Sequence, residues 1–270
     1  MKRIRLLVFL FSIFSYSYSQ TPKAQSYAEQ GRLAIVGKKY KEAIKFFDTA
    51  ISIDAGNSLA FYRRGLAKGL IEDWLEALTD YDKAIEMGEN YFEIWHNRGV
   101  AKYFLKDYIN AIPDFEKAIK FDSNNLMSYL YIGYSQEFLQ SYPSSIAAFN
   151  KALKIDPKEA SAYAHRAVCY MRLEKYDAAM KDIQKSLALN TTQSMCYHLR
   201  AQVKAIKGDL KGALKDINFV LKDHPDYYLA LTTRAIIRKQ MHDKKGACED
   251  YQKALALGDE REPQLDEYCK

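Results

Sequence analysis

Residue classes recur every 34 residues from Ala24 to Arg261, in seven consecutive units without an insertion. The units begin at Ala24, Ser58, Phe92, Leu126, Ala160, Ser194 and Tyr228. A repeat of this length is a supersecondary unit that cannot bury its apolar face alone, so neighbouring units must pack on each other. The repeat therefore predicts one elongated array, although 270 residues would otherwise suggest one or two globular domains.

Each unit contains two stretches with helical spacing, as the third unit illustrates. Trp95 and Gly99 lie on one helical face, and Ala111 and Phe115 lie on the face of a second helix after a short polar break. Small residues at a helix crossing let the two backbones approach while large side chains fill the flanks. We therefore expect an antiparallel helical hairpin in each unit.

We number the residues of each unit from 1 to 34, and the small and large classes then hold across the units. Position 8 reads Gly31, Gly65, Gly99, Gly133, Ala167, Ala201 and Ala235. Position 20 reads Ala43, Ala77, Ala111, Ser145, Ala179, Ala213 and Ala247, and position 24 reads Phe47, Tyr81, Phe115, Phe149, Ile183, Ile217 and Tyr251. Position 4 is aromatic in every unit except the last, which has Leu231.

These units resemble tetratricopeptide repeats, with seven in tandem covering about nine tenths of the chain. The resemblance implies an all-α fold, a right-handed superhelical solenoid of antiparallel helix pairs. The chain departs from the family pattern at position 11, where only Tyr170 complies, and at position 32, where only Pro157 and Pro225 match. The interlock of small and large residues persists in all seven units, so we expect these departures to leave the fold intact.

The amino terminus has the pattern of a secretory signal peptide of a bacterial-type exported protein. Lys2, Arg3 and Arg5 make the first five residues basic, and residues 6–14 are apolar. Ser17 and Ser19 are the small residues that precede a signal-peptidase cleavage site, so we expect cleavage between Ser19 and Gln20. The alternative is a membrane anchor, but the apolar run is about half of the roughly 20 residues that a bilayer requires. We predict a periplasmic or secreted protein without stable membrane insertion after cleavage.

The chain accordingly divides into four segments. We predict a signal peptide at residues 1–19, a short leader at 20–23, the seven repeats at 24–261 and a capping helix at 262–270. The last segment has a proline in its first turn and Leu265 where the aromatic of position 4 belongs. A terminal helix of this kind covers the last apolar face and shows a polar surface to water.

Composition argues against several functional classes. Cleavage would remove three positive charges and reduce the formal charge from +6 to +3, which is too small to indicate nucleic-acid binding. The sequence has no glycine-rich phosphate loop and no nucleophile motif, and its five histidines are scattered. We expect no catalytic activity, no cofactor and no metal.

Two positions vary together. Position 7 is arginine and position 23 is aspartate in units two, three, five, six and seven, whereas units one and four lack both. Because a partly buried arginine needs a carboxylate, we predict structural ion pairs within each unit. The predicted pairs are Arg64 with Asp80, Arg98 with Asp114, Arg166 with Asp182, Arg200 with Asp216, and Arg234 with Asp250.

Two of the four cysteines could form a disulfide. Cys248 and Cys269 are symmetric about the turn at residues 258–259, so they stand at the same height on two antiparallel helices, provided that their side chains face each other. Cys169 and Cys196 are offset by about 10 Å along their helices and are predicted to be buried thiols. The same offset argues against a zinc site formed with His165 and His198.

The first helices of tetratricopeptide repeats line a concave face, and the resemblance places a groove on units two to four. Its predicted lining is apolar and aromatic: Tyr62, Leu66, Leu70, His96, Val100, Tyr103, Phe104, Met127, Leu130, Tyr134 and Phe138. A contiguous apolar strip marks a binding surface, unless tight winding buries these side chains against each other. Of the Lys, Asn and Arg residues of the carboxylate clamp found in chaperone-binding members, these units supply only Asn97, so a chaperone carboxyl-terminal tail is not the expected ligand.

We derive two functional hypotheses. The first is a non-catalytic scaffold that binds a peptide or helix of a partner protein in its concave groove. The second is a structural subunit of a cell-envelope or secretion assembly that uses its convex and end surfaces. The sequence names no partner and fixes no oligomeric state.

Overall fold

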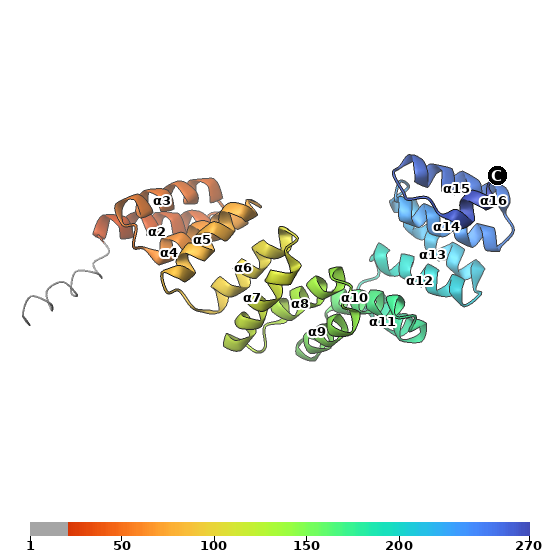
Figure 1. Cartoon of the computed structure of the whole chain (residues 1–270), viewed down its shortest axis with the longest axis horizontal. Helices are drawn as coiled ribbons and strands as arrows, with labels where there is room; N and C mark the ends of the chain where they lie inside the picture. The colour runs from red at the N-terminus through yellow and green to blue at the C-terminus, as the bar shows by residue number, and fades with distance from the viewer. Residues whose placement is uncertain (1–20) are drawn as a thin grey trace, which may run out of the picture. The chain divides into compact units, whose positions relative to one another are not determined.

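The computed structural model describes residues 21–270, and these residues contain fifteen helices and no strand. The chain divides after Asn124 into two compact units, which are described separately. Figure 1 shows the helices following one another as antiparallel pairs within each unit. The predicted signal peptide lies outside the described residues.

The first compact unit, residues 21–124, contains three helix pairs. The first helices of the pairs are α2 (Pro22–Val36), α4 (Ser58–Gly69) and α6 (Phe92–Phe104). The second helices are α3 (Tyr40–Ile53), α5 (Trp74–Glu86) and α7 (Tyr108–Phe121).

The second compact unit, residues 125–270, contains four helix pairs and a terminal helix. Its first helices are α8 (Leu126–Phe138), α10 (Ala160–Arg172), α12 (Ser194–Ile206) and α14 (Tyr228–Gln240). Its second helices are α9 (Tyr142–Ile155), α11 (Tyr176–Leu189), α13 (Leu210–Asp223) and α15 (Lys244–Ala256), and the terminal helix is α16 (Pro263–Tyr268).

Helix boundaries follow the repeat register closely. Five of the seven first helices span positions 1–13, and every second helix begins at position 17. The first helix α2 begins earlier, because Pro22 occupies the first turn, where no amide donor is needed, and the Thr21 hydroxyl accepts from the Ala24 amide at 3.3 Å. Pro22 and Lys23, which the sequence assigned to a leader, are therefore helical.

The core of each pair is the contact between positions 8 and 24. The Phe115 ring is fully buried and packs on Gly99, where an added Cβ would lie 2.9 Å from Cε1 of that ring. Gly133 and Phe149 repeat this arrangement at 2.6 Å. A side chain at either glycine would displace the ring, so close helix approach depends on the small residue.

The turn between the two helices has one conformation throughout the array. Position 15 takes a positive φ in all seven units, at Lys38, Glu72, Lys106, Gln140, Glu174, Gly208 and His242. Only Gly208 lacks the steric penalty that a left-handed conformation imposes on side chains. The turn is therefore set by the packing of the two helices, which overrides local preference in six units.

Helix α16 covers the last apolar face of the array. Leu265 is fully buried against Ala235 and Tyr251. A disulfide joins Cys248 on α15 to Cys269, with Cα atoms 5.5 Å apart and a sequence separation of 21. The carboxyl-terminal segment is thus fixed both by apolar burial and by a covalent link.

No helix within residues 21–270 combines the length and the apolar character needed to cross a membrane.

Candidate protein-binding surfaces

Buried ion pairs hold the first helix to the second helix in five of the seven repeats. Arg98 donates from Nε and Nη2 to the two carboxylate oxygens of Asp114, at 2.8 and 2.5 Å, and Asp114 is almost fully buried. The other four predicted arginine and aspartate pairs form the same two-pronged contact at 2.6–2.9 Å, namely Arg64 with Asp80, Arg166 with Asp182, Arg200 with Asp216 and Arg234 with Asp250. Charge-assisted bidentate bonds of this kind fix geometry strongly.

A second cation, at position 11, meets the same aspartate. Lys102 Nζ lies 2.7 Å from Asp114 Oδ2. The equivalent contacts are Lys68 with Asp80 at 2.9 Å, Lys204 with Asp216 at 2.8 Å and Arg238 with Asp250 at 2.7 Å. This explains the departure from the family pattern at position 11, because a basic residue there supplies a second partner for a buried carboxylate.

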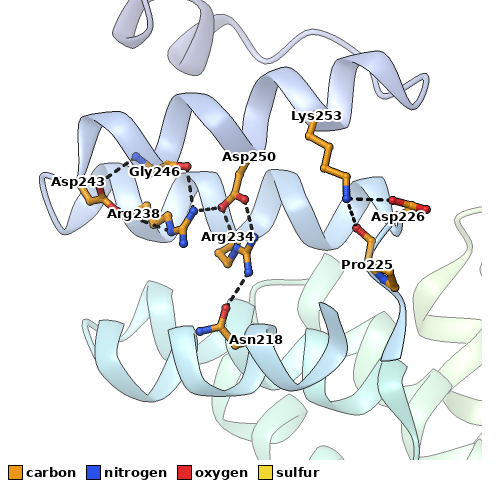
Figure 2. Close-up of polar contacts among 9 residues, drawn as sticks. All are labelled: Asn218, Pro225, Asp226, Arg234, Arg238, Asp243, Gly246, Asp250 and Lys253. Atoms are coloured by element: carbon orange, nitrogen blue, oxygen red, sulfur yellow. Dashed lines mark hydrogen bonds and ion pairs between the residues drawn. The ribbon is translucent and has the colours of Figure 1, made fainter. Parts of the chain in front are cut away.

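The arginine at position 7 also reaches the preceding repeat. Arg98 donates from Nη1 to Asp82 Oδ1 at 2.8 Å. Arg234 donates from Nη1 to Asn218 Oδ1 at 2.9 Å, and Figure 2 shows this second contact. In the same view, Arg238 contacts Asp250 from the other side. Arg64 and Arg166 make the equivalent contacts with Asp48 and Asn150, so four of the five arginines join a first helix to the second helix of the preceding repeat.

The two cations around Asp216 keep this carboxylate ionised. Burial by itself raises the pKa of Asp216, but hydrogen bonds from Arg200 and Lys204 outweigh burial and hold that pKa below its usual value. The pairs are structural, since both charges face each other inside the helix pair and leave no unpaired group to act on a substrate.

Tyr62 and His96, two of the predicted groove residues, are used for packing, Tyr62 against the next repeat and His96 within its own. Tyr62 accepts a hydrogen bond from Asn97 of the next repeat at 3.1 Å, and burial raises the pKa of its hydroxyl to about 12. His96 lies between the rings of Phe92 and Phe115, and burial lowers its pKa to about 4. Both side chains are half-buried, so they offer a partner only part of their surface.

Leu66, Val100 and Tyr103 are also half-buried within residues 21–124. The Tyr103 ring meets the rings of Phe104 and Tyr108 edge-on, with centroids 5.5 and 5.4 Å away. These half-buried side chains pack beneath the aromatic surface at the end of α6 and contribute little exposed area to it.

Phe104 is the large exposed aromatic residue of this surface. Its ring stacks on Trp74 of the preceding repeat, with centroids 4.4 Å apart and planes 11° apart, while 47% of Phe104 stays exposed. Leu70, the residue that caps α4, is also exposed. Phe104 and Leu70 therefore form an apolar surface, in which the Trp74 ring packs against Phe104 and fixes its position.

The prediction that Leu130 lines a groove is wrong. Leu130 is 3% exposed and belongs to a core cluster with Phe149 of α9 and Ala162 of α10. It occupies position 5, the position at which Tyr62 contacts the next repeat, so the following first helix covers it.

Tyr134 is half-buried in the second compact unit, where its hydroxyl lies 2.9 Å from Ser161 Oγ and its ring lies against His165. Met127 and Phe138, at the start and the end of α8, remain exposed.

Exposure is concentrated at position 13, where each first helix ends. The apolar side chains at this position are Val36, Leu70, Phe104, Phe138 and Ile206, and all five are exposed. The sequence therefore located the correct helices, but the accessible apolar surface lies at their carboxyl ends and turns, whereas position 5 is used for packing between repeats.

A pocket that the sequence analysis missed lies in residues 125–270. Its volume is about 360 Å³, and its apolar lining comes mainly from α10, α12 and α14, with Tyr176 at the start of α11 adding an aromatic ring: Val168, Met171, Tyr176, Leu199, Ile206, Ile236 and Ile237. Arg172, Gln202, Thr233 and Gln240 supply the polar groups. The signal was present at positions 9, 12 and 13 of units five to seven, whereas the predicted groove residues all belong to units two to four.

Histidine and cysteine side chains near these surfaces are engaged in packing. His198 Nε2 lies 2.7 Å from Thr233 Oγ1, and burial lowers the pKa of His198 to about 4. Cys169 and Cys196 are buried free thiols, and burial raises the pKa of Cys169 to about 11. Across residues 21–270, no three His, Cys, Asp or Glu side chains are grouped to hold a metal ion.

Antiparallel helix pairs repeated in register, with ion pairs joining successive pairs, define a helical-repeat protein. A model of the tetratricopeptide repeat family matches residues 24–57 and 92–125, and a second tetratricopeptide repeat model matches residues 132–193. The intervening residues keep the same register. Tetratricopeptide repeats are therefore present in residues 24–57, 92–125 and 132–193, and the all-α fold of paired helices is confirmed.

Solved structures support the fold. A tetratricopeptide repeat protein from Parabacteroides merdae is 18% identical, aligns over 92% of this chain and 98% of its own, and has a TM-score of 0.68. The carboxyl-terminal part of a repeat-containing protein from Cytophaga hutchinsonii is 17% identical over 90% of this chain and 99% of its own, with a TM-score of 0.65.

A third solved structure is YrrB, described as a tetratricopeptide repeat protein with an unusual peptide-binding site. It is 19% identical over 71% of this chain and 97% of its own, with a TM-score of 0.62. Identities this low establish the shared fold alone. No curated protein matches the chain.

Proposed function

We propose that this protein is a non-catalytic scaffold that binds a peptide or helix of a partner protein on the surface formed by its first helices. The family fold indicates protein–protein interaction, and YrrB is described as having a peptide-binding site. The observation that carries the proposal is Phe104, a large aromatic side chain that is 47% exposed yet stacked on Trp74. A preorganised aromatic surface loses little entropy on binding, which favours recognition.

The binding surface in residues 21–124 is centred on Leu70 and Phe104. Both side chains lie where a first helix ends, and Val36 occupies the equivalent place on α2. Exposed apolar residues at matching positions of successive repeats suit an amphipathic or extended segment that lays apolar side chains along them.

The test compares two phenylalanines of equal exposure. Phe104→Ser combined with Leu70→Ser should abolish partner capture in a pull-down from the native envelope fraction. Phe121→Ser, at a residue on the second helix α7 that is 48% exposed, should leave capture unchanged. Capture that survives the first change and is lost with the second would overturn the proposal and favour a structural subunit of an envelope assembly that uses its second-helix surface.

We also propose that the protein works outside the cytoplasm, in the periplasm or the extracellular space. The signal-peptide pattern of residues 1–19 supports this, and so does the pairing of Cys248 with Cys269, because disulfides persist in oxidising compartments. Expression of the full chain followed by fractionation and mass spectrometry of its amino terminus should show cleavage before Gln20. An intact amino terminus in the cytosolic fraction would contradict this assignment.

A further inference from the structure

The pocket between α10, α12 and α14 differs from the Phe104 surface in being hollow. Its volume of about 360 Å³ lies at the lower end of the range for ligand pockets, about 300–1,000 Å³. Val168 and Met171 of α10 face Ile237 of α14 across it, with Leu199 of α12 among the lining. The cavity therefore suits an apolar group of the size of a large side chain.

The pocket has few polar groups, and they differ in whether they already have a hydrogen-bond partner. Thr233 and His198 are hydrogen-bonded to each other, and Gln202 Nε2 lies 3.3 Å from His198 Nε2, so these groups are already engaged. Arg172 is the only charged side chain among the lining residues, it is exposed, and no carboxylate lines the pocket. The charge of the pocket is therefore complementary to an anionic group.

The surroundings of the pocket favour a polypeptide over a small molecule. Ile206 and Ile236 line the pocket, yet they remain 53% and 37% exposed. A ligand confined to the cavity would leave the outer parts of these side chains exposed to water. A peptide chain that crosses α12 and α14 would cover both side chains. Burial of this additional apolar area would stabilise the complex.

We infer that this pocket receives one large apolar side chain of a partner protein, from a segment that carries a carboxylate beside that side chain to pair with Arg172. The inference rests on the proposed function in one respect, since it takes the ligand to be a segment of another protein. It adds a second contact point in residues 125–270 and specifies the chemistry of the segment that binds there.

The experiment selects ligands without knowing the native partner. A phage library of random peptides is selected on the full mature protein and on two variants, Arg172→Glu and Ala205→Leu. The Arg172 change reverses the charge at an exposed position, and the Ala205 change adds bulk to the lining of the pocket. Lys185→Glu, at an exposed lysine of α11, is the matched charge control, and circular dichroism checks that each variant is folded.

Peptides selected on the unchanged protein should be enriched in a large apolar residue next to Asp or Glu. Their binding should weaken at least about tenfold with Arg172→Glu and with Ala205→Leu, and should be unchanged with Lys185→Glu. Selection on Arg172→Glu should shift the enriched charge from acidic to basic.

Two results would overturn the inference. One is the absence of any enriched peptide, and the other is a set of peptides that bind equally well to the Arg172 and Ala205 variants. Neither result bears on the Phe104 surface, because the pull-down with the Leu70 and Phe104 variant tests that surface separately.

Discussion

Arg98 binds both oxygens of the buried Asp114, with Nη2 at 2.5 Å from Oδ1 and Nε at 2.8 Å from Oδ2, and Lys102 Nζ lies 2.7 Å from the same Oδ2. The same arginine reaches the preceding repeat through Asp82, whose side chain is 46% exposed. One guanidinium thus joins a buried carboxylate and an exposed one, which permits a direct comparison of their contributions to stability.

Asp114→Asn should lower the free energy of unfolding by about 3 kcal/mol, because it leaves two partly buried cations facing a neutral amide. Asp82→Asn should cost less than about 1 kcal/mol, because water screens the exposed pair. Urea unfolding of the mature chain, followed by circular dichroism, measures both. Equal costs at the two positions would show that burial does not control these pairs.

The contact between positions 8 and 24 predicts a compensating pair of substitutions. Gly99→Ala should destabilise the protein by about 1–3 kcal/mol, because the new Cβ lies 2.9 Å from the Phe115 ring. Units five and six carry alanine and isoleucine at these positions, so Phe115→Ile should recover part of the loss in the double variant. Strictly additive losses in the double-mutant cycle would argue that the two residues do not compete for space.

The turn at position 15 allows the cost of backbone strain to be measured without a contribution from side-chain contacts. Gly208 has φ of 84°, and no atom lies within 4 Å of an added Cβ, so Gly208→Ala should cost about 1 kcal/mol through backbone strain alone. Gly37→Ala is the control, since its φ is −76° and its nearest contact is an ordinary 3.5 Å. A thermal midpoint lowered equally by both would contradict this explanation.

Stability should fall in two steps as the pH is lowered. Burial lowers the pKa of His96 and of His198 from 6.5 to about 4, so the unfolded chain takes up protons first, and stability present above pH 6.5 is lost as the pH falls toward 4. The slope is up to about 1.4 kcal/mol per pH unit for each histidine. Asp216, whose pKa is lowered by its hydrogen bonds with Arg200 and Lys204, adds a loss below about pH 3.9.

Unfolding curves measured across this range test the assignment. His198→Gln should remove part of the loss between pH 6.5 and 4 and leave the loss at lower pH unchanged. A histidine variant with the same pH dependence as the original protein would assign the first step to other groups.

Most of the fold could be predicted from the sequence, because the same pattern of small and large residues occurs in all seven repeats. The five arginine and aspartate pairs were identifiable since both partners are missing together in units one and four. The contribution of position 11 was present in the same correlation, as Lys68, Lys102, Lys204 and Arg238, but was interpreted only as a departure from the family pattern.

The candidate surfaces were less predictable, because exposure along a helix depends on how the neighbouring repeat covers it. Leu130 and Phe138 belong to the same apolar helix, yet the first is buried by α10 and the second is exposed at the helix end. The pocket near Arg172 arises where side chains from three successive first helices leave space between them, and no single repeat contains that information.

A photo-reactive phenylalanine analogue placed at position 104 tests the central claim most directly, with the same analogue at position 121 as its control. Irradiation in cells that express the full chain, followed by mass spectrometry, should show one cross-linked partner polypeptide from position 104 and none from position 121. A partner cross-linked from position 121 alone would contradict the claim that the first helices form the recognition surface.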